Sequence, residues 1–375
     1  MDRKNRTPRR FLFLLPVFLL CLLLSPLSLR SEQTQSSVLR GTDTRLSYAV
    51  SSLKEKALDG LTAIRKIYRL PHDALAPAPD PEGYGLVHTA EEMLEVFDRA
   101  SLLLDGREPI FKADTPFDQE KGVRYYCDDS ILALVWYQDM KDGNNLDSVV
   151  TFGEVFLSDA SQFRRKLSDD AFGAGAHKFP TDMALSVNAV LATSGDFYRF
   201  RSLGFCVFEG ELCRLDAAKV DTCAIDRNGD LLFIPAGTIT DEESAKAYIE
   251  EHGVDFTLSF GPVMIEDHQP VYTHYYALGE ANENYPRFCI AQDGRLHYLF
   301  SVIKGCMSVS AFTDFMMETG VERCYALDGG QSGTIVMEGT ALNPSMYGYG
   351  NDAQRAQSDI IYFASAIPES ERGRS

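Results

Sequence analysis

Four glycine-containing turns in the second half of the 375-residue chain constrain its fold more than any other feature. In each, an acidic or amide residue precedes glycine between two short β-prone runs. This pattern favours a two-residue β-hairpin, whose turn positions need a positive φ. Such short turns join antiparallel strands, whereas parallel strands need a long crossover. The chain is therefore predicted to consist mainly of antiparallel strands. The four turns are Glu209-Gly210, Asn228-Gly229, Asp293-Gly294 and Glu338-Gly339.

Strand-like runs far outnumber helical runs after about residue 122. One predicted helix follows Thr240 and ends at Gly253, and another runs from about Ser310 to Glu318. We therefore predict an α+β fold, with a large mixed or antiparallel sheet and a few packed helices. The predicted strands are 130–137, 148–157, 187–193, 204–208, 222–225, 231–235, 255–260, 287–292, 296–303, 323–327, 333–337 and 359–364.

The first 30 residues differ from the rest in composition. Five basic residues precede residues 11–29, which carry no charge and are mostly Leu and Phe. An apolar run of this length approaches what a bilayer core requires, and the basic flank favours a cytoplasmic N-terminus. A cleaved signal peptide is the alternative, although it would have a shorter apolar core and small residues at its end. Either way, the rest of the chain is predicted to lie outside the cytoplasmic membrane, anchored by a single helix or secreted.

Composition also divides the chain into predicted segments. Apolar spacing favours a stalk helix at 46–69, and the proline-rich stretch 71–81 marks a boundary. Thr89 and Glu92 fit a capping box at the start of a helix that ends near Leu104. The predicted segments are 1–30 (basic start and anchor or signal peptide), 31–81 (linker and stalk helix), 82–120 (helical lead-in), 121–366 (main domain) and 367–375 (polar tail).

Charge and motif content argue against several partners and cofactors. The net charge of −18 makes nucleic acid an improbable partner. The pattern Asp226-x-Asn228-x-Asp230 superficially resembles a calcium loop, but it lacks the closing Glu and lies between two predicted strands, so a hairpin turn is favoured. No histidine or cysteine spacing indicates a metal site. No cofactor is therefore predicted, and a divalent metal is not indicated.

The stretch YALDGGQSGTIVMEG, residues 325–339, raises the question of function. Asp328 ends an apolar run, and small residues follow it, including Gly329, Gly330 and Ser332. A turn is one interpretation, because Asp-Gly is a strong turn signal. Contact with a ligand is the other, because successive N–H groups without large side chains form anion-binding concavities. The pattern alone leaves both interpretations open.

Other charged residues also lie near strand ends. Asp196 follows a buried strand and a glycine, and Arg199, Arg287 and Arg355 lie near other strands. Paired carboxylates serve as acid, base or nucleophile in glycosidic cleavage, and arginine forks bind phosphate. Taken singly, each residue fits a surface turn or an ordinary ion pair equally well.

Taken in order, these motifs resemble the phosphodiester glycosidase family. The resemblance covers about residues 121–366, and the lead-in is similar to the bacterial, membrane-anchored or secreted branch. The motifs are Gly-Asp-aromatic at 195–197, Ser-Phe-Gly-Pro at 259–262, Pro-Arg at 286–287, Leu-Asp-Gly-Gly-x-Ser at 327–332 and Arg-x-x-Ser-Asp at 355–359.

The resemblance implies an enzyme that cleaves a sugar from a sugar-1-phosphodiester, with bacterial relatives linked to exopolysaccharide or wall polymers. It implies that an Asp acts on the anomeric carbon or leaving oxygen, while arginines and loop N–H groups contact the phosphodiester. Arg199 and Lys304 are added as candidate phosphate contacts. The residues on the family's pocket motifs are Asp196, Arg287, Asp328, Gly329, Gly330, Ser332 and Arg355.

Three positions depart from the family pattern: Ser194 replaces an amide residue, Gln331 a glycine, and Lys304 lies in a shortened loop. The predicted function is an extracytoplasmic hydrolase that acts on phosphodiester-linked sugar in surface polysaccharide or cell-wall glycan. The alternative is a catalytically degenerate member that binds phosphorylated glycan without turnover.

Overall fold

The computed structural model describes residues 66–173, 177–196, 198–217, 219–271, 283–344 and 354–372. Residues 65–375 form one compact unit. The predicted anchor or signal segment and most of the predicted stalk helix lie outside the described residues. Residues 66–69 at the end of that helix are described, and they are not helical. Within the described part of the chain, no helix is both long and apolar enough to cross a membrane.

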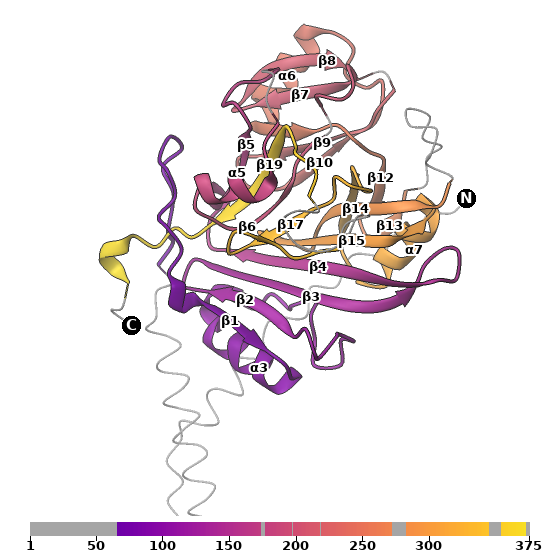
Figure 1. The fold of residues 1–375 in the computed structure, drawn as a ribbon. Coiled ribbons are helices and arrows are strands. Elements are labelled where there is room, and N and C mark those ends of the chain that lie inside the picture. Colours follow the sequence, from indigo (N-terminus) through magenta and orange to yellow (C-terminus); the bar gives the residue numbers. More distant parts are fainter. Residues whose placement is uncertain are drawn as a thin grey trace, which may run out of the picture. The chain divides into compact units, whose positions relative to one another are not determined.

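A nine-stranded sheet crosses the lower half of Figure 1. Its strand order is β1-β2-β3-β4-β15-β14-β16-β12-β13. The first seven residues of β3 are all buried, as expected for a strand covered on both faces. The strands are β1 (Tyr84–Val87), β2 (Val123–Cys127), β3 (Ile131–Lys141), β4 (Asp147–Leu157), β12 (Val263–Glu266), β13 (Gln269–Pro270), β14 (Tyr285–Gln292), β15 (His297–Met307) and β16 (Arg323–Leu327).

A five-stranded sheet with the order β18-β17-β6-β19-β5 packs against the nine-stranded sheet. Aromatic rings join the two: Phe363 of the five-stranded sheet lies 5.6 Å from Phe300 and 5.5 Å from Tyr298 of the nine-stranded sheet, measured between ring centroids. The helix α5 (Pro180–Ser186) packs on the five-stranded sheet through a separate apolar cluster. The strands are β5 (Phe163–Leu167), β6 (Ala189–Ser194), β17 (Ile335–Met337), β18 (Thr340–Ala341) and β19 (Asp359–Ala364).

Two small sheets and α6 (Glu242–His252) form the upper part of the unit in Figure 1. They share an apolar cluster that includes Phe205, Ala224 and Ala245. One sheet has the order β10-β9-β11, and the other is the hairpin β7–β8. The strands are β7 (Gly204–Phe208), β8 (Glu211–Asp216), β9 (Thr222–Asp226), β10 (Leu231–Ile234) and β11 (Val254–Leu258).

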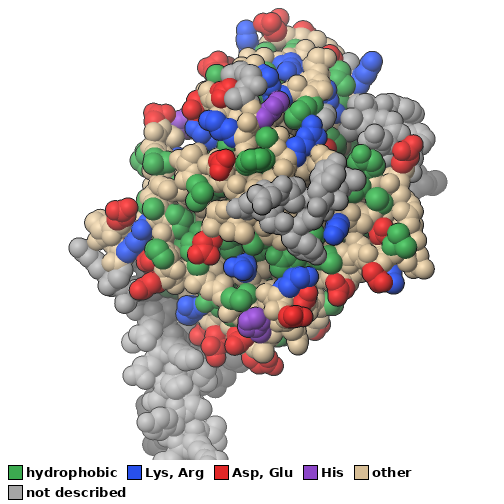
Figure 2. Space-filling view, in the orientation of Figure 1, with side chains coloured by type: hydrophobic (Ala, Val, Ile, Leu, Met, Phe, Trp, Pro, Cys, Tyr) green, Lys and Arg blue, Asp and Glu red, His purple; other side chains and the backbone are tan. Residues whose placement is uncertain are grey.

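The remaining helices are short and lie at the edges. The predicted capping box of Thr89 and Glu92 is confirmed at the start of α3, whose Met93 and Val96 are buried. Charged side chains of both signs are interspersed over the face shown in Figure 2. The elements are α3 (Ala90–Arg99), α4 (Ser101–Leu104), α7 (Val309–Met317) and the 3₁₀ turns η1 (Pro81–Gly83), η2 (Ala160–Gln162) and η4 (Glu369–Glu371).

The α+β prediction is confirmed at the level of antiparallel sheets with few helices, and all four predicted hairpins are present. Every strand pair among the described residues is antiparallel, so of the two predicted alternatives, mixed or antiparallel, the large sheet is the antiparallel one. One detail of the prediction was wrong. The strands divide into several sheets, because the chain leaves the large sheet after β16 and joins the second at β17.

Candidate functional site

The loop 328–334 connects two sheets and is not a hairpin turn. It leaves β16 in the nine-stranded sheet and enters β17 in the five-stranded sheet. Gly329 lies against β14: a Cβ at this position would stand 2.1 Å from the carbonyl oxygen of Pro286. The close approach of two backbones therefore requires a residue without a side chain here.

The N–H groups of this loop are largely used within the protein. Gly330 donates to the Pro286 carbonyl at 3.3 Å, and Ser332 and Gly333 donate to the Gly329 carbonyl at 2.9 and 3.3 Å. The expectation that the glycine run presents its N–H groups to a phosphate is therefore not met at these three positions. What the loop delivers to the site is the side chains of Asp328 and Ser332.

Asp196 reaches the same region from the end of β6. Its side chain is buried, and its N–H lies 3.1 Å from each carboxylate oxygen of Asp359, the first residue of β19. The N–H of Gly195 donates to the Asp359 carbonyl at 3.1 Å. Two neighbouring strands of the five-stranded sheet thus fix the turn that carries Asp196.

Asp328 lies in an electrostatic environment shared with Asp196. Burial raises the pKa of Asp328 to about 6, and the negative charge of Asp196 contributes to this rise. A hydrogen bond with Ser332 and the charges of Arg355 and Arg201 oppose it. Oδ2 of Asp328 is buried and has no hydrogen-bond partner among the described residues. The two predicted acids are therefore close enough for one charge to act on the other.

Arg355 lies beside Ser332, and its positive charge acts on Asp328. Its Nη1 lies 3.4 Å from Oγ of Ser332, and its guanidinium stacks on the ring of Phe200 at 4.3 Å. Ser332 itself is buried. The loop after β16 and the segment before β19 thus place a hydroxyl and a guanidinium beside Asp328.

Arg201 is a residue that the sequence prediction missed. Its Nη2 donates to the carbonyl oxygens of Ser259 and Phe260, and its Nη1 is buried without a hydrogen-bond partner among the described residues. Arg199 was chosen instead, but its Nη1 donates to the Gly173 carbonyl in another loop. Two arginines two positions apart in one loop look alike in sequence, and only the path of the loop separates them.

Arg287 and Lys304 are not among the groups whose charges act most strongly on Asp328. Arg287 donates to the carbonyl oxygens of Met307 and Glu283, at 2.7 and 2.6 Å. Lys304 is exposed on β15. The described contacts thus assign Arg287 to holding the backbone beside the loop, and they do not bring Lys304 to the acids.

Ser194, one of the three departures from the family pattern, has a structural role. Its Oγ accepts the N–H of Thr334 at 3.2 Å, while its own N–H donates to the Thr334 carbonyl at 3.1 Å. This exchange ties the end of β6 to the segment that leads into β17. Gln331, the other departure within the loop, is half-buried.

The described residues contain no group of three or more His, Cys, Asp or Glu side chains that could hold a metal ion. Asp226 shows why its calcium-like pattern is a turn. Its Oδ1 accepts the N–H groups of Asn228 and Asp230, at 2.9 and 2.8 Å. The carboxylate is thus used to close the β9–β10 hairpin.

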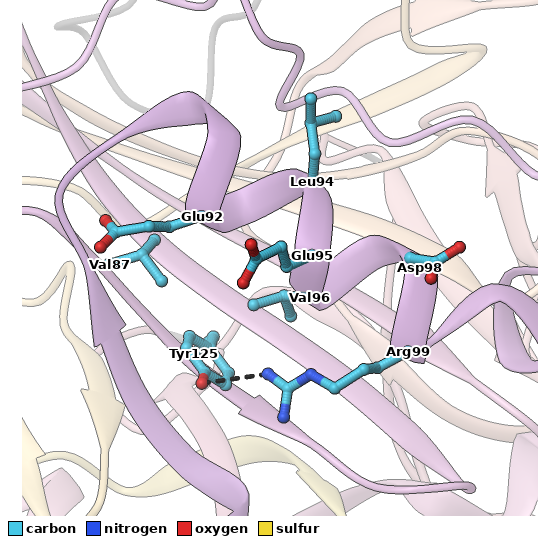
Figure 3. A pocket seen from close by; sticks show the side chains of 8 residues that line it. All are labelled: Val87, Glu92, Leu94, Glu95, Val96, Asp98, Arg99 and Tyr125. Carbon is cyan, nitrogen blue, oxygen red and sulfur yellow. Dashed lines mark hydrogen bonds between the residues drawn. The ribbon is translucent and has the colours of Figure 1, made fainter.

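Surface cavities elsewhere on the unit do not contain these acids. Figure 3 shows one beside α3, where Arg99 donates to the hydroxyl of Tyr125 at 3.1 Å. A second lies near β5 and the β9–β10 hairpin, with Arg164 and Asp255 among its lining residues. The convergence of two carboxylates, a hydroxyl and two guanidiniums therefore identifies the candidate site, rather than the shape of the surface.

Comparisons with known proteins concern the family and the fold. Residues 187–364 match the family model described as phosphodiester glycosidase. The comparison with curated proteins found no match. Among solved structures, the chain is similar to the zebrafish N-acetylglucosamine-1-phosphodiester alpha-N-acetylglucosaminidase catalytic domain auto-inhibited by its pro-peptide. The TM-score is 0.51 and the identity 16%, over 63% of this chain and 84% of that chain.

A hypothetical protein from Synechocystis is similar as well, with a TM-score of 0.50 and 12% identity, over 67% of this chain and 64% of that one. At such identities the two structures show the fold alone. The matched span of the family model contains both acids, Ser332, Arg201 and Arg355. The match to the phosphodiester glycosidase family model therefore covers the part of the chain that carries the candidate site, a little under half of the sequence.

Proposed function

We propose that this protein is a glycosidase that releases a sugar from a sugar-1-phosphodiester. The observation that carries the proposal is the pairing of Asp196 and Asp328 beside Arg355 and Arg201. Carboxylates supply the acid, base or nucleophile for glycosidic cleavage, and guanidiniums neutralise a phosphodiester. The similar zebrafish domain bears the name of an N-acetylglucosamine-1-phosphodiester glycosidase, which supports the same substrate class.

The proposed reaction is hydrolysis at the anomeric carbon. The bond from that carbon to the phosphate oxygen breaks, water supplies the new hydroxyl, and a phosphate monoester leaves. Asp328, with its pKa raised to about 6, would hold a proton near the leaving oxygen for part of the time at neutral pH. Asp196 would act either as the nucleophile at the anomeric carbon or as the base that takes a proton from the attacking water.

The arginines would stabilise the charge that develops on the departing phosphate. Arg201 suits this role because backbone carbonyls hold its Nη2, while its Nη1 is buried without a described hydrogen-bond partner. Arg355 is oriented by Ser332 and by the ring of Phe200. Both guanidiniums thus keep a fixed geometry in the absence of substrate, which lowers the cost of binding.

The site of action is proposed to lie outside the cytoplasmic membrane, on surface polysaccharide or cell-wall glycan. The basic start and the uncharged residues 11–29 support a single membrane-spanning helix with the N-terminus inside. This orientation is tested by fusing to the C-terminus either a reporter that is active only outside the cytoplasm or one that is active only inside it. Activity of the second reporter alone would contradict the proposal.

A second candidate function is binding of phosphorylated glycan without turnover. The observation that favours it is Gln331, a half-buried side chain at a position where the resembled family has glycine. A Gln side chain would fill space that glycine leaves open at this position, three residues after Asp328.

Sugar release by the full-length chain in mild detergent distinguishes the two functions. The substrates are UDP-linked and methylphospho-linked α-N-acetylglucosamine, with and without a divalent cation. We expect release by the wild type and a loss of about 10²- to 10⁴-fold in Asp196→Asn and Asp328→Asn. Asp293→Asn, the same change in the β14–β15 turn, serves as the control and should leave release unchanged. Binding of these compounds without release would favour the second function.

A further inference from the structure

A buried ion pair, Arg165 with Asp359, lies next to the backbone of Asp196. Nε of Arg165, on β5, is 2.7 Å from Oδ2 of Asp359, and the two side chains are 1% and 0% exposed. Nη1 of Arg165 donates to the Thr257 carbonyl at 2.7 Å. Burying such a pair costs more solvation than its attraction commonly returns, so a stability role alone explains it poorly.

The pair is in direct contact with the turn that carries Asp196. Both carboxylate oxygens of Asp359 lie 3.1 Å from the Asp196 N–H. A Cβ on Gly195 would stand 2.2 Å from Oδ2 of Asp359, so the carboxylate fits only because this residue is glycine. The Arg165 guanidinium also lies over the ring of Tyr198, two residues after Asp196, at 5.4 Å. The turn is thus held on both sides by the two members of the pair.

We infer that Arg165 and Asp359 are positioning residues for Asp196, fixing its backbone and balancing the charge around its carboxylate. The inference rests on the proposed function, since it assigns Asp196 a part in the reaction. Asp359 supplies an acceptor and a negative charge, and Arg165 supplies the positive charge that lets two acids lie side by side.

The charges around Asp196 determine what each half of the pair does. Burial raises the pKa of Asp359 to about 6, Arg165 opposes this rise, and the Asp196 charge adds to it. The charge of Asp196 acts on Arg165 (β5), Cys206 (β7), Cys223 (β9), Asp359 (β19) and, from loops, Tyr198 and Asp328. Of these groups Arg165, Asp359 and Asp328 carry charge near neutral pH, and the charges of Arg201 and Arg355 act in turn on Asp328.

Removing the negative charge of Asp359 and removing the positive charge of Arg165 should therefore have opposite effects on the pH profile of kcat/KM. The acid limb of that profile is the range in which kcat/KM rises with pH. In Asp359→Asn the amide oxygen still accepts the Asp196 N–H, but the positive charge of Arg165 is no longer balanced, so the acid limb should move down by about one pH unit. In Arg165→Gln the adjacent Asp196 and Asp359 lose the guanidinium that balances their charges, and the limb should move up by about one unit.

Two further variants separate positioning from general damage. Arg165→Lys keeps the positive charge, so the acid limb should stay within a few tenths of a pH unit of wild type. It loses the planar guanidinium with its several N–H donors, so kcat should fall. His297→Gln disrupts a different fully buried polar contact, between His297 and Glu154 at 2.7 Å, in the nine-stranded sheet. It should lower the melting temperature without moving the acid limb.

The experiment is the pH profile of sugar release for the full-length wild type and these four variants, together with their melting temperatures. Opposite shifts in Asp359→Asn and Arg165→Gln support the inference. A working wild type whose two variants shift in the same direction, or not at all, overturns the inference alone. A wild type that releases no sugar overturns the proposed function, and the inference with it.

Discussion

Two acid-glycine pairs ten residues apart, Asp328-Gly329 and Glu338-Gly339, have different structural roles. Glu338 and Gly339 have φ values of 52° and 65°, and they join β17 to β18 with Met337 opposite Thr340. That turn stays within one sheet, and its acid is exposed. Asp328 instead begins a crossing between two sheets, is half-buried, and lies among the charges of other strands.

The difference shows that a local signal is only part of what decides a loop's role. Both pairs carry turn chemistry, but β16 and β17 have partners in different sheets. The end of β16 is therefore brought to the end of β6 and the start of β19, where Asp196 and Asp359 lie. The Glu338 carboxylate at the hairpin is exposed, whereas Oδ2 of Asp328, at the crossing between sheets, is buried.

Alanine at the two glycines is the strongest test of this comparison. Gly329→Ala places a Cβ 2.1 Å from the Pro286 carbonyl oxygen, so backbone must move, at a cost of about 3 kcal/mol. Gly339→Ala meets the flexible end of Leu185 at 2.8 Å and incurs the positive-φ penalty, about 1 to 2 kcal/mol.

Urea unfolding of both full-length variants measures these costs. Equal losses at the two positions would show that the loop can relax away from β14, contrary to the close approach described above. A circular dichroism spectrum like that of wild type is the control for retained fold.

The two arginines of the 196–204 segment give a smaller effect on activity. Arg201→Ala removes a guanidinium whose charge acts on Asp328, so kcat/KM for a sugar-1-phosphodiester should fall about 10- to 100-fold. Arg199→Ala removes a donor to the Gly173 carbonyl and should change kcat/KM less than about threefold. Steady-state kinetics decide between them, and a larger loss for Arg199→Ala would reverse the assignment.

Local chemistry explains why much of the fold could be predicted from sequence. The four hairpins follow from residues that accept a positive φ, and β16 begins and ends as predicted because its apolar run is bounded by polar residues. The strand β5, FRRKL, was missed because its charges suggest an exposed segment. Arg165 is nevertheless buried there, since its partner Asp359 is supplied from β19, nearly two hundred residues later.

The candidate site was predicted in part for the same reason. Asp196, Asp328, Ser332 and Arg355 follow from motifs, each short and continuous in sequence. Arg201 and the Arg165–Asp359 pair depend on which strands become neighbours, and no local pattern encodes that. The predicted substrate contact of the glycines stays a prediction; Gly329 makes room for protein backbone, a contact that spacing alone could not distinguish from one with a ligand.

The pH dependence of stability gives the smallest of these effects and tests the enclosed state of Asp328 directly. Its folded pKa is about 6, above the ordinary value of 3.8, because burial disfavours the charged form. Its contribution to stability is therefore fully present below about pH 4 and is lost as the pH rises through about 6. Asp328→Asn removes the buried charge, so at pH 8 it should stabilise the protein by about 1 to 2 kcal/mol, while at pH 4 it should change little.

Glu338→Gln is the matched control at the exposed turn. Thermal unfolding at both pH values measures the difference, and a pH slope that changes equally in both variants would contradict the enclosure of Asp328. Asp328→Asn should therefore gain stability and lose sugar release, because the buried charge of Asp328 destabilises the fold and is needed for the reaction.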